Sequence, residues 1–296
     1  MAKRVIGWWS GGVTSAVACK LSMALYGKKN VRIIFIDTGN EDDDTYRFMK
    51  DCEKWYGVDI ETISAIGDKY GSIQDVWIKY KGMNFAHGAI CSTHLKRNVR
   101  IDWQKENDFD YQVFGFDIDE PKRARAMTLN NADAKPIYPL LMHGMSKKMC
   151  MDYLKVYGID VPNAYSMGFR NNNCLKTGCV QGGIGYWQKM KRDLPGAFDA
   201  MAKMEHKLTE LKGAPVTMCK NQSNKAKLSG NTLLFLKSHP KYPHVKTIDD
   251  VKGREPEPLF ECNGFCGTND LEDRSSTEGE INNQLDLWEE TEKREH

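Results

Sequence analysis

The 296-residue chain lacks the features that mark several broad classes of protein. No run of about 18 apolar residues is present, so the sequence does not predict a transmembrane helix. The opening Met-Ala-Lys-Arg leads straight into an apolar segment rather than a secretory signal. No internal repeat is visible. We therefore expect a globular protein of the cytoplasm with no membrane partner.

A disulfide framework is also not indicated. The chain has nine cysteines, an odd number, and thiols stay mostly reduced in the cytoplasm. With 41% hydrophobic and 28% charged residues, the composition is that of a globular protein. The length allows one sizeable core, or a main domain with a smaller appendage.

The net charge of +2 conceals an asymmetry along the chain. Residues 269–296 carry ten carboxylates and three basic side chains, a net charge of −7, which leaves +9 on residues 1–268. The lysine-rich span 189–254 suits a polyanion such as RNA or DNA, although solvated lysines on helix faces would give the same pattern. The composition of the acidic tail predicts a flexible segment.

A short hydroxyl-rich loop stands between an apolar run at residues 4–9 and a helical pattern at residues 13–25 that Gly27 ends. A loop in that place aims backbone N–H groups and the helix dipole at an anion, and its glycines let the anion approach the backbone. It has neither the Gly-Lys-Ser/Thr ending of a Walker loop nor G-x-G-x-x-G. The loop therefore predicts a site for a nucleotide phosphate, although a tight strand-to-helix turn without a ligand is the alternative. The predicted residues of the site are Ser10, Gly11, Gly12, Val13, Thr14 and Ser15.

A second apolar run at residues 31–36 ends in Asp37, Thr38 and Gly39. In a doubly wound sheet, ligands lie beyond the carboxyl ends of the strands, so these three residues are predicted to lie beside the first loop. The carboxylates at 41–44 suit the N-terminal turn of a predicted helix at residues 44–56.

The loop is similar to the S-G-G-x-[DT]-S loop of the ATP pyrophosphatases, the PP-loop or adenine nucleotide alpha hydrolase enzymes. The order of strand, Asp-Thr-Gly, acidic residues and Thr-Tyr-Arg-Phe resembles the phosphoadenosine phosphosulfate reductase branch of that superfamily. Three later segments follow in the family's order: the Cys91 to Lys96 segment, a predicted strand at 111–116 that leads to Gly115 and Asp117, and a predicted extended segment at 136–141. One position differs, because Asp117 stands where the family has an arginine. The resemblance covers roughly residues 4–190, and the stretch 168–187 is similar to reductase-like PP-loop proteins of bacteria and phages.

Alternating strand and helix patterns up to about residue 145 predict an α/β fold, a doubly wound and mainly parallel sheet. The resemblance implies an adenine nucleotide alpha hydrolase-like form of it. We predict a nucleotide-binding domain at 1–145, a mostly helical part with cysteine loops at 146–268, and the acidic tail at 269–296. Helices are predicted near 149–157 and at 186–192, and an irregular connection at 237–246.

Two cysteine pairs each span a loop that contains glycine: Cys174 with Cys179, and Cys262 with Cys266. Four thiolates could bind zinc or a [4Fe-4S] cluster, and the spacing does not separate the two. Resemblance to assimilatory adenylyl-sulfate reductases favours the cluster, and unligated thiols are the remaining alternative. Three further cysteines are predicted to be small buried apolar residues: Cys19, Cys52 and Cys150.

The resemblance implies a reaction in which the loop binds ATP with Mg²⁺, an acceptor oxygen attacks the α-phosphorus and pyrophosphate leaves. We favour an ATP-dependent adenylyl-transfer enzyme acting in sulfur transfer or in nucleobase or nucleic-acid modification. Ser10, Thr14 and Asp37 are the candidate catalytic residues, and Lys96 and Gly115 join the nucleotide-binding set.

Two other functions remain open. A thiol-dependent sulfonucleotide reductase would use Cys262 as nucleophile, since Glu261-Cys262-Asn263-Gly264 partly matches the reductases' C-terminal segment. A non-catalytic nucleotide- or nucleic-acid-binding protein could stack bases on its seven tryptophans and twelve tyrosines. The sequence indicates neither the acceptor nor the oligomeric state.

Overall fold

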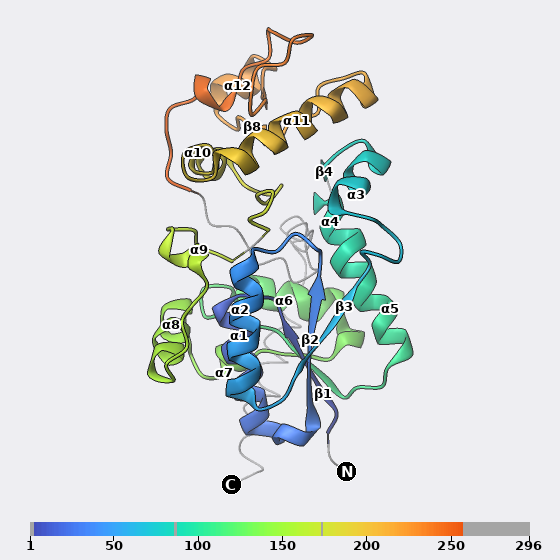
Figure 1. Ribbon diagram of the computed structural model, residues 1–296, viewed down its shortest axis with the longest axis vertical. Helices are drawn as coiled ribbons and strands as arrows, with labels where there is room; N and C mark the ends of the chain where they lie inside the picture. Colours follow the sequence, from blue (N-terminus) through green and yellow to red (C-terminus); the bar gives the residue numbers. More distant parts are fainter. Residues whose placement is uncertain (1–2, 86–87, 173, 257–296) are drawn as a thin grey trace, which may run out of the picture.

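The computed structural model describes residues 3–85, 88–172 and 174–256. At its centre lies a five-stranded sheet in the order β3-β2-β1-β6-β7, and each neighbouring pair of strands is parallel. This arrangement confirms the predicted α/β class with a mainly parallel sheet (Figure 1). The strands are β1 Val5–Trp9, β2 Val31–Asp37, β3 Ile60–Ser64, β6 Tyr111–Val113 and β7 Pro136–Ile137.

Helices cover both faces of the sheet. Val5 and Trp9 of β1 pack into a cluster with α1, α2 and α8, whereas Ile6 and Trp8 pack into a second cluster with α5 and α6. Because every side chain of β1 is buried, the strand reads in the sequence as one continuous apolar run. The flanking helices are α1 Val13–Tyr26, α2 Asp43–Tyr56, α5 Asn98–Glu106, α6 Pro121–Asn130 and α8 Lys147–Val156.

The predicted ends of the first two helices agree with the structure to within a residue. Gly27 follows α1 with a φ of 83°, and its N–H donates to the carbonyl of Met23. Helix α2 begins at Asp43, one residue before the prediction, because the side chain of Asp42 accepts a hydrogen bond from the Asp44 N–H.

Two predicted strands are shorter than expected. The strand predicted at 111–116 ends at Val113. The Phe114 N–H still donates to the Ile137 carbonyl of β7 at 3.1 Å, but residues 114–116 belong to no strand. The extended segment predicted at 136–141 is a strand for two residues only, and α7 (Pro139–Met142) follows it. Proline has a backbone φ that suits the first turn of a helix and no N–H for a ladder, so Pro139 starts a helix here.

Above the carboxyl edge of the sheet lies a mostly helical lobe (Figure 1). It contains α10, α11 and a small antiparallel hairpin whose two strands flank α12. Residues 237–246 form no helix or strand, as predicted. The elements are α10 Ile184–Asp193, α11 Pro195–Lys212, β8 Cys219–Lys220, α12 Asn224–Leu228 and β9 Leu233–Leu234.

The hydrophobic core of this lobe draws residues from both halves of the chain. Trp77 and Leu95 pack in the same cluster as Trp187 and Phe198, although the predicted domain boundary lies between them at residue 145. That boundary therefore stays a prediction. The remaining short elements are α3 Ile73–Tyr80, α4 Ile90–Ser92, α9 Asn163–Ser166, β4 Asn84–Phe85 and β5 Gly88–Ala89.

Two smaller expectations concern membrane helices and cysteines. Among the described residues, no helix combines the length and the apolar character needed to cross a membrane. The three cysteines expected as small apolar core residues are all buried: Cys19, Cys52 and Cys150.

Candidate functional site

The loop at residues 10–15 connects the carboxyl end of β1 to the first turn of α1. The amide and the hydroxyl of Ser10 both donate to Ser15 Oγ at 3.0 Å, and Ser15 Oγ donates to the Gly12 carbonyl at 2.9 Å. Gly11 has a φ of 85°, a conformation that favours glycine, and a Cβ there would lie 2.8 Å from Thr45 Cγ2. The loop is thus closed on itself by its own serines.

Helix α1 presents its N-terminus at this loop. Its N-cap is Gly12, which has no side chain to cap the first turn, and Val13 N donates to the Tyr165 hydroxyl at 3.3 Å. The first N–H groups of a helix have no intrahelical acceptor and lie at the positive end of its dipole. This end of the 14-residue helix therefore favours an anionic ligand.

Gly115, just beyond β6, touches the backbone of the same loop. A Cβ at this position would lie 2.6 Å from both Ser15 Cα and Ser15 N, far inside van der Waals contact. Gly115 therefore lies against the loop, and no residue larger than glycine fits at this position. Asp117, two residues on, is buried, and its carboxylate accepts the Asp119 N–H at 2.9 Å.

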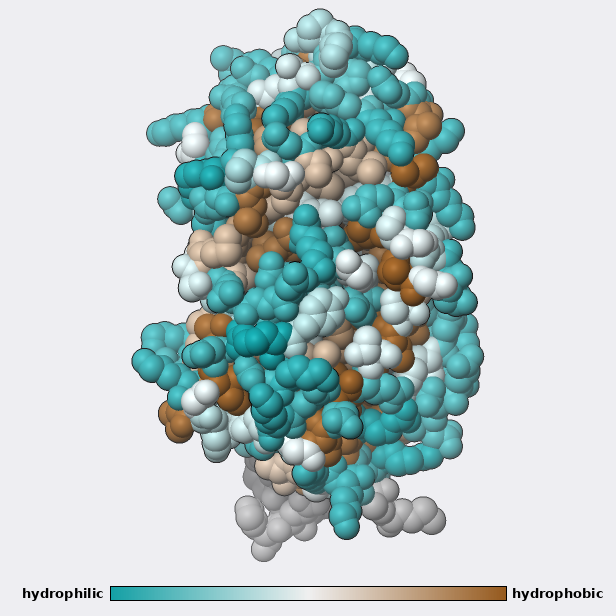
Figure 2. Space-filling view, in the orientation of Figure 1, coloured by the Kyte–Doolittle hydropathy of each residue, from teal (hydrophilic) through white to brown (hydrophobic). Residues whose placement is uncertain are grey.

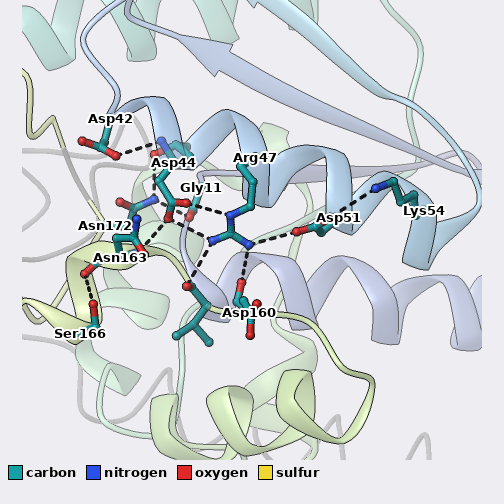
Figure 3. Close-up of polar contacts among 12 residues, drawn as sticks. Gly11, Asp42, Asp44, Arg47, Asp51, Lys54, Asp160, Asn163, Ser166 and Asn172 are labelled. Carbon is teal, nitrogen blue, oxygen red and sulfur yellow. Dashed lines mark hydrogen bonds and ion pairs between the residues drawn. The ribbon is translucent and has the colours of Figure 1, made fainter.

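Asn172 links the loop to α2, and the sequence did not single it out as a site residue. Its Nδ2 donates at 2.9 Å to the Gly11 carbonyl and at 2.9 Å to Thr45 Oγ1, and the side chain is buried (Figure 3). The run of asparagines at 171–173 before Cys174 was the available signal. Buried amides usually have a specific hydrogen-bonding partner, but the sequence does not say which.

Arg47 of α2 anchors the segment 160–163, which precedes Asn172 in the chain (Figure 3). Its guanidinium bonds Asp44 at 2.8 Å and Asp51 at 3.0 Å, and donates to the Asp160 carbonyl at 2.8 Å. Asp44 in turn accepts the Asn163 N–H at 2.7 Å. The hydrogen bond from Arg47 holds the pKa of Asp44 below its usual value, so the anchor stays charged around neutral pH.

Asp37 and Gly39, predicted in the nucleotide site, form a turn with local partners. The Tyr46 hydroxyl donates to both Asp37 carboxylate oxygens at 3.0 and 2.9 Å, and Gly39 N donates to one of them at 2.7 Å. Burial, and then the Asp37 charge, raise the pKa of Tyr46. Asp37 is not among the residues that line the pocket described below, so its catalytic role stays a prediction.

Thr38 leads into a buried ion pair that includes Lys96. Thr38 Oγ1 donates to Glu41 Oε1 at 3.1 Å, and the same oxygen lies 3.5 Å from Lys96 Nζ. The side chains of Lys96 and Glu41 are only 9% and 2% exposed. Lys96 lies in a π-helical turn, Thr93–Arg97, between α4 and α5, and such turns occur frequently at functional sites.

These elements surround a pocket of about 500 Å³, counted out to its mouth, at the carboxyl edge of the sheet. Ser10 and Lys96 of the predicted binding set line the pocket, together with Asn172, which is not in that set. Its other lining residues are Ile73, Trp77, Ala89, Cys91, Cys174, Gly178, Cys179, Val180 and Gln181.

Three cysteines line this pocket, two of them from the predicted metal set. Burial, and then the Glu41 charge, raise the pKa of the Cys174 thiol. Cys262 and Cys266 lie outside the described residues, and among the residues that are described no three His, Cys, Asp or Glu side chains gather closely enough to hold a metal ion. The described thiols alone do not fit zinc or a [4Fe-4S] cluster, so the four-cysteine site stays a prediction.

Residues 4–180 match the family model of the phosphoadenosine phosphosulfate reductase domain. No curated protein sequence matches the chain.

Similar solved structures include phosphoadenylyl-sulfate reductase from Candida auris in complex with phosphate, which is 16% identical, with a TM-score of 0.43 and coverage of 58% of this chain and 81% of that one. The U34-tRNA thiolase NcsA from Methanococcus maripaludis with its [4Fe-4S] cluster is 16% identical, with a TM-score of 0.40 and coverage of 70% and 73%. NMN synthetase from Francisella tularensis is 14% identical, with a TM-score of 0.38 and coverage of 56% and 73%. Similarity this low does not inform the reaction.

Proposed function

The chain belongs to the phosphoadenosine phosphosulfate reductase domain family, and from this premise we propose that it is an ATP-dependent adenylyl-transfer enzyme. It binds ATP at the Ser10–Ser15 loop and cleaves the nucleotide between its α- and β-phosphates. The observation that carries this proposal is the complete loop, which is closed by Ser10 and Ser15 and lies at the N-terminus of α1.

The loop is suited to phosphate by geometry and by charge. The helix dipole and the first-turn N–H groups attract a polyphosphate, and the hydroxyl of Thr14 or Ser10 can add hydrogen bonds. Gly11 and Gly115 keep side chains out of the space around the loop backbone. Asn172 fixes the Gly11 carbonyl, so the loop is organised before a ligand arrives.

Lys96 supplies the positive charge in the pocket. An acceptor oxygen attacks the α-phosphorus, the bond from that phosphorus to the bridging oxygen breaks, and its electron pair leaves with pyrophosphate. Negative charge therefore accumulates on the leaving group, where a cation lowers the barrier. Glu41 holds the ammonium in place, and their ion pair is buried, so the charge is positioned rather than mobile. Mg²⁺ ordinarily accompanies ATP and would neutralise part of the phosphate charge.

A sulfonucleotide reductase is the second candidate, because the matched family carries that name and three thiols line the pocket. In that reaction the Cys262 thiolate attacks the sulfur of the sulfonucleotide, an S–S bond forms and the adenosine phosphate leaves with the S–O electron pair. A thioredoxin-type dithiol then reduces the enzyme thiosulfonate and releases sulfite. Sulfite release that is lost in Cys262→Ser would establish this function, and release that persists in the variant would exclude it.

The proposed reaction is tested by its products. The purified chain is incubated with ATP labelled at the α-phosphate and with an extract that supplies acceptors. Labelled AMP or adenylyl product, with an equal amount of pyrophosphate, is expected. Labelled ADP would contradict α-β cleavage, and stoichiometric binding without turnover would indicate the non-catalytic alternative. ATP with a methylene group between the α- and β-phosphates should inhibit without being consumed.

Gly12→Asp tests the site itself. A carboxylate in the loop repels the phosphates, so nucleotide binding should be abolished. Gly12→Asn is the matched control, because it adds the same bulk without charge and should retain measurably tighter binding. Unchanged ATP affinity in Gly12→Asp would refute the assignment of the loop.

A further inference from the structure

The lobe above the pocket contains a long stretch of chain without a single carboxylate. Between Glu210 and Asp249 lie 38 residues with seven lysines and no Asp or Glu. All seven lysine side chains are exposed. Hydrophilic residues cover most of this end of the molecule on the face that Figure 2 shows.

The lysines differ in whether a carboxylate neutralises them. Lys237 pairs with Asp199 at 2.7 Å, and Lys241 lies 4.0 Å from Glu210. Lys220, Lys225 and Lys227, by contrast, have no ion pair with any carboxylate of the described chain. We refer to these three as the hairpin lysines, because they lie on β8 and α12 of the hairpin β8-α12-β9.

The hairpin that carries them is well supported from beneath. Cys219, Ala226 and Leu234 are buried, and the Ser223 hydroxyl accepts the Ala226 N–H at 3.3 Å at the start of α12. Glu205 of α11 lies under the hairpin and accepts the Met218 N–H at 2.5 Å and the Leu236 N–H at 2.7 Å. The backbone that presents the hairpin lysines is therefore fixed by the lobe's own core.

This hairpin adjoins the pocket. Cys219 Sγ lies 4.0 Å from the Gly182 carbonyl, and Gln181, the residue before Gly182, lines the pocket. Lys220 follows Cys219 directly. A chain-like ligand on the hairpin can therefore reach the rim of the pocket.

We propose that the hairpin lysines bind the phosphate backbone of a nucleic acid strand and hold it at the mouth of the pocket. Exposed lysine ammonium groups without a carboxylate partner attract phosphates, and their binding releases counterions from the strand. Exposed amide and hydroxyl side chains beside them supply further donors: Gln222, Asn224, Ser229 and Asn231. The statement that this strand is also the adenylylated acceptor rests on the proposed function, whereas the binding itself does not.

The experiment measures binding of the full chain to a fluorescent single-stranded RNA of mixed sequence, as a function of salt. The triple variant Lys220→Gln, Lys225→Gln and Lys227→Gln should weaken binding about tenfold or more near 0.1 M salt. It should also lower the slope of log affinity against log salt by about 2 to 3, because each phosphate contact contributes about 0.7 to 0.9. The matched control, Lys28→Gln, Lys29→Gln and Lys155→Gln, removes the same charge from exposed lysines outside the lobe and should leave the slope nearly unchanged.

Single-stranded DNA of the same sequence and the corresponding duplexes identify the strand type, and poly-glutamate tests for a general preference for anions. Equal slopes for the two triple variants, or no salt-dependent binding by the wild type, would overturn the proposal. Poly-glutamate binding with the same affinity and the same loss in the hairpin variant would overturn it in favour of an acidic protein partner. Gly12→Asp should bind RNA normally, so failure of the ATP site and failure of the hairpin are separable.

Discussion

The pocket and the hairpin lysines use positive charge in opposite ways. Lys96 in the pocket is almost fully buried and lies 3.5 Å from Glu41, whereas Lys225 and Lys227 on the hairpin are exposed and have no carboxylate partner among the described residues. A buried pair responds little to salt and is fixed in position, while exposed charges are screened and adapt to a ligand. The difference suits one compact nucleotide in the pocket and a long polyanion on the hairpin.

Apart from the loss of binding expected for Gly12→Asp, the largest effect is expected on the Ser10–Ser15 loop, from Gly115→Ala. The new Cβ would lie 2.6 Å from backbone atoms of Ser15, so the Ser10–Ser15 loop must shift. We expect ATP affinity to fall about 100-fold, which corresponds to about 2.7 kcal/mol and lies within the usual cost of overpacking.

Titration calorimetry with ATP measures this loss. Gly196→Ala is the control, since no described atom lies within 4 Å of a Cβ at that exposed position. Equal affinities for the two variants would show that the loop does not depend on the approach of Gly115.

The next effect concerns the support beneath the hairpin. Burial raises the pKa of Glu205 to about 8, from 4.5 in the unfolded chain. The folded state therefore binds the proton more tightly, and the stability from Glu205 is lost as the pH rises from about 4.5 to about 8. Between pH 6 and pH 7 this loss is at most about 1.4 kcal/mol.

Urea unfolding of Glu205→Gln at the two pH values measures this contribution. In the variant, the free energy of unfolding should no longer show the pH dependence that Glu205 contributes. The amide cannot accept both backbone N–H groups, so the variant should also be less stable by an amount that does not change with pH. Glu210→Gln, at an exposed carboxylate, is the control. The same pH dependence in wild type and Glu205→Gln would show that Glu205 is ionised throughout.

A smaller effect is expected from Asn172→Ala, which removes the hydrogen bonds to Gly11 and Thr45. Loss of a buried partner costs about 1 kcal/mol or more, so ATP affinity should fall about fivefold to tenfold. Asn231→Ala, in the exposed part of the lobe, should leave it unchanged. A Kd for Asn172→Ala within twofold of the wild type would remove Asn172 from the site.

The smallest effect sharpens the contrast within the lobe itself. Lys225→Gln should lower the salt slope of RNA binding by about one, because its charge has no carboxylate partner in the described chain. Lys237→Gln should lower it by less than half as much, because Asp199 already neutralises Lys237 at 2.7 Å. Equal changes would mean that the ion pair does not determine which lysines contact the strand.

The sequence predicted the parallel sheet and the strand-to-helix position of the Ser10–Ser15 loop because their signals are local. The apolar run at Val5–Trp9, the glycines of the loop and the stop at Gly27 each determine a few neighbouring residues. Strand ends were less predictable. The chain after Val113 stays apolar although it belongs to no strand, since Phe114 and Phe116 are buried in the core with residues of α6.

The contacts that the sequence missed join residues far apart in the chain. Asn172 lies 161 positions from Gly11, and the pairing of Lys96 with Glu41 joins a π-helical turn to the segment after β2. Nothing local marks such partners, because the tertiary fold alone brings them together. The sequence drew attention to the lysines of the lobe, but only the structure separates those with carboxylate partners from those without.

The central claim, that the loop is an ATP site, is tested most directly by calorimetry with two ligands. ATP and 3′-phosphoadenosine 5′-phosphosulfate are titrated separately into the wild-type chain and into Gly12→Asp, in the presence of Mg²⁺. We predict that ATP binds the wild type at least about tenfold more tightly than the sulfonucleotide and that Gly12→Asp abolishes this binding. Tighter binding of the sulfonucleotide, or ATP binding that survives in Gly12→Asp, would contradict the claim.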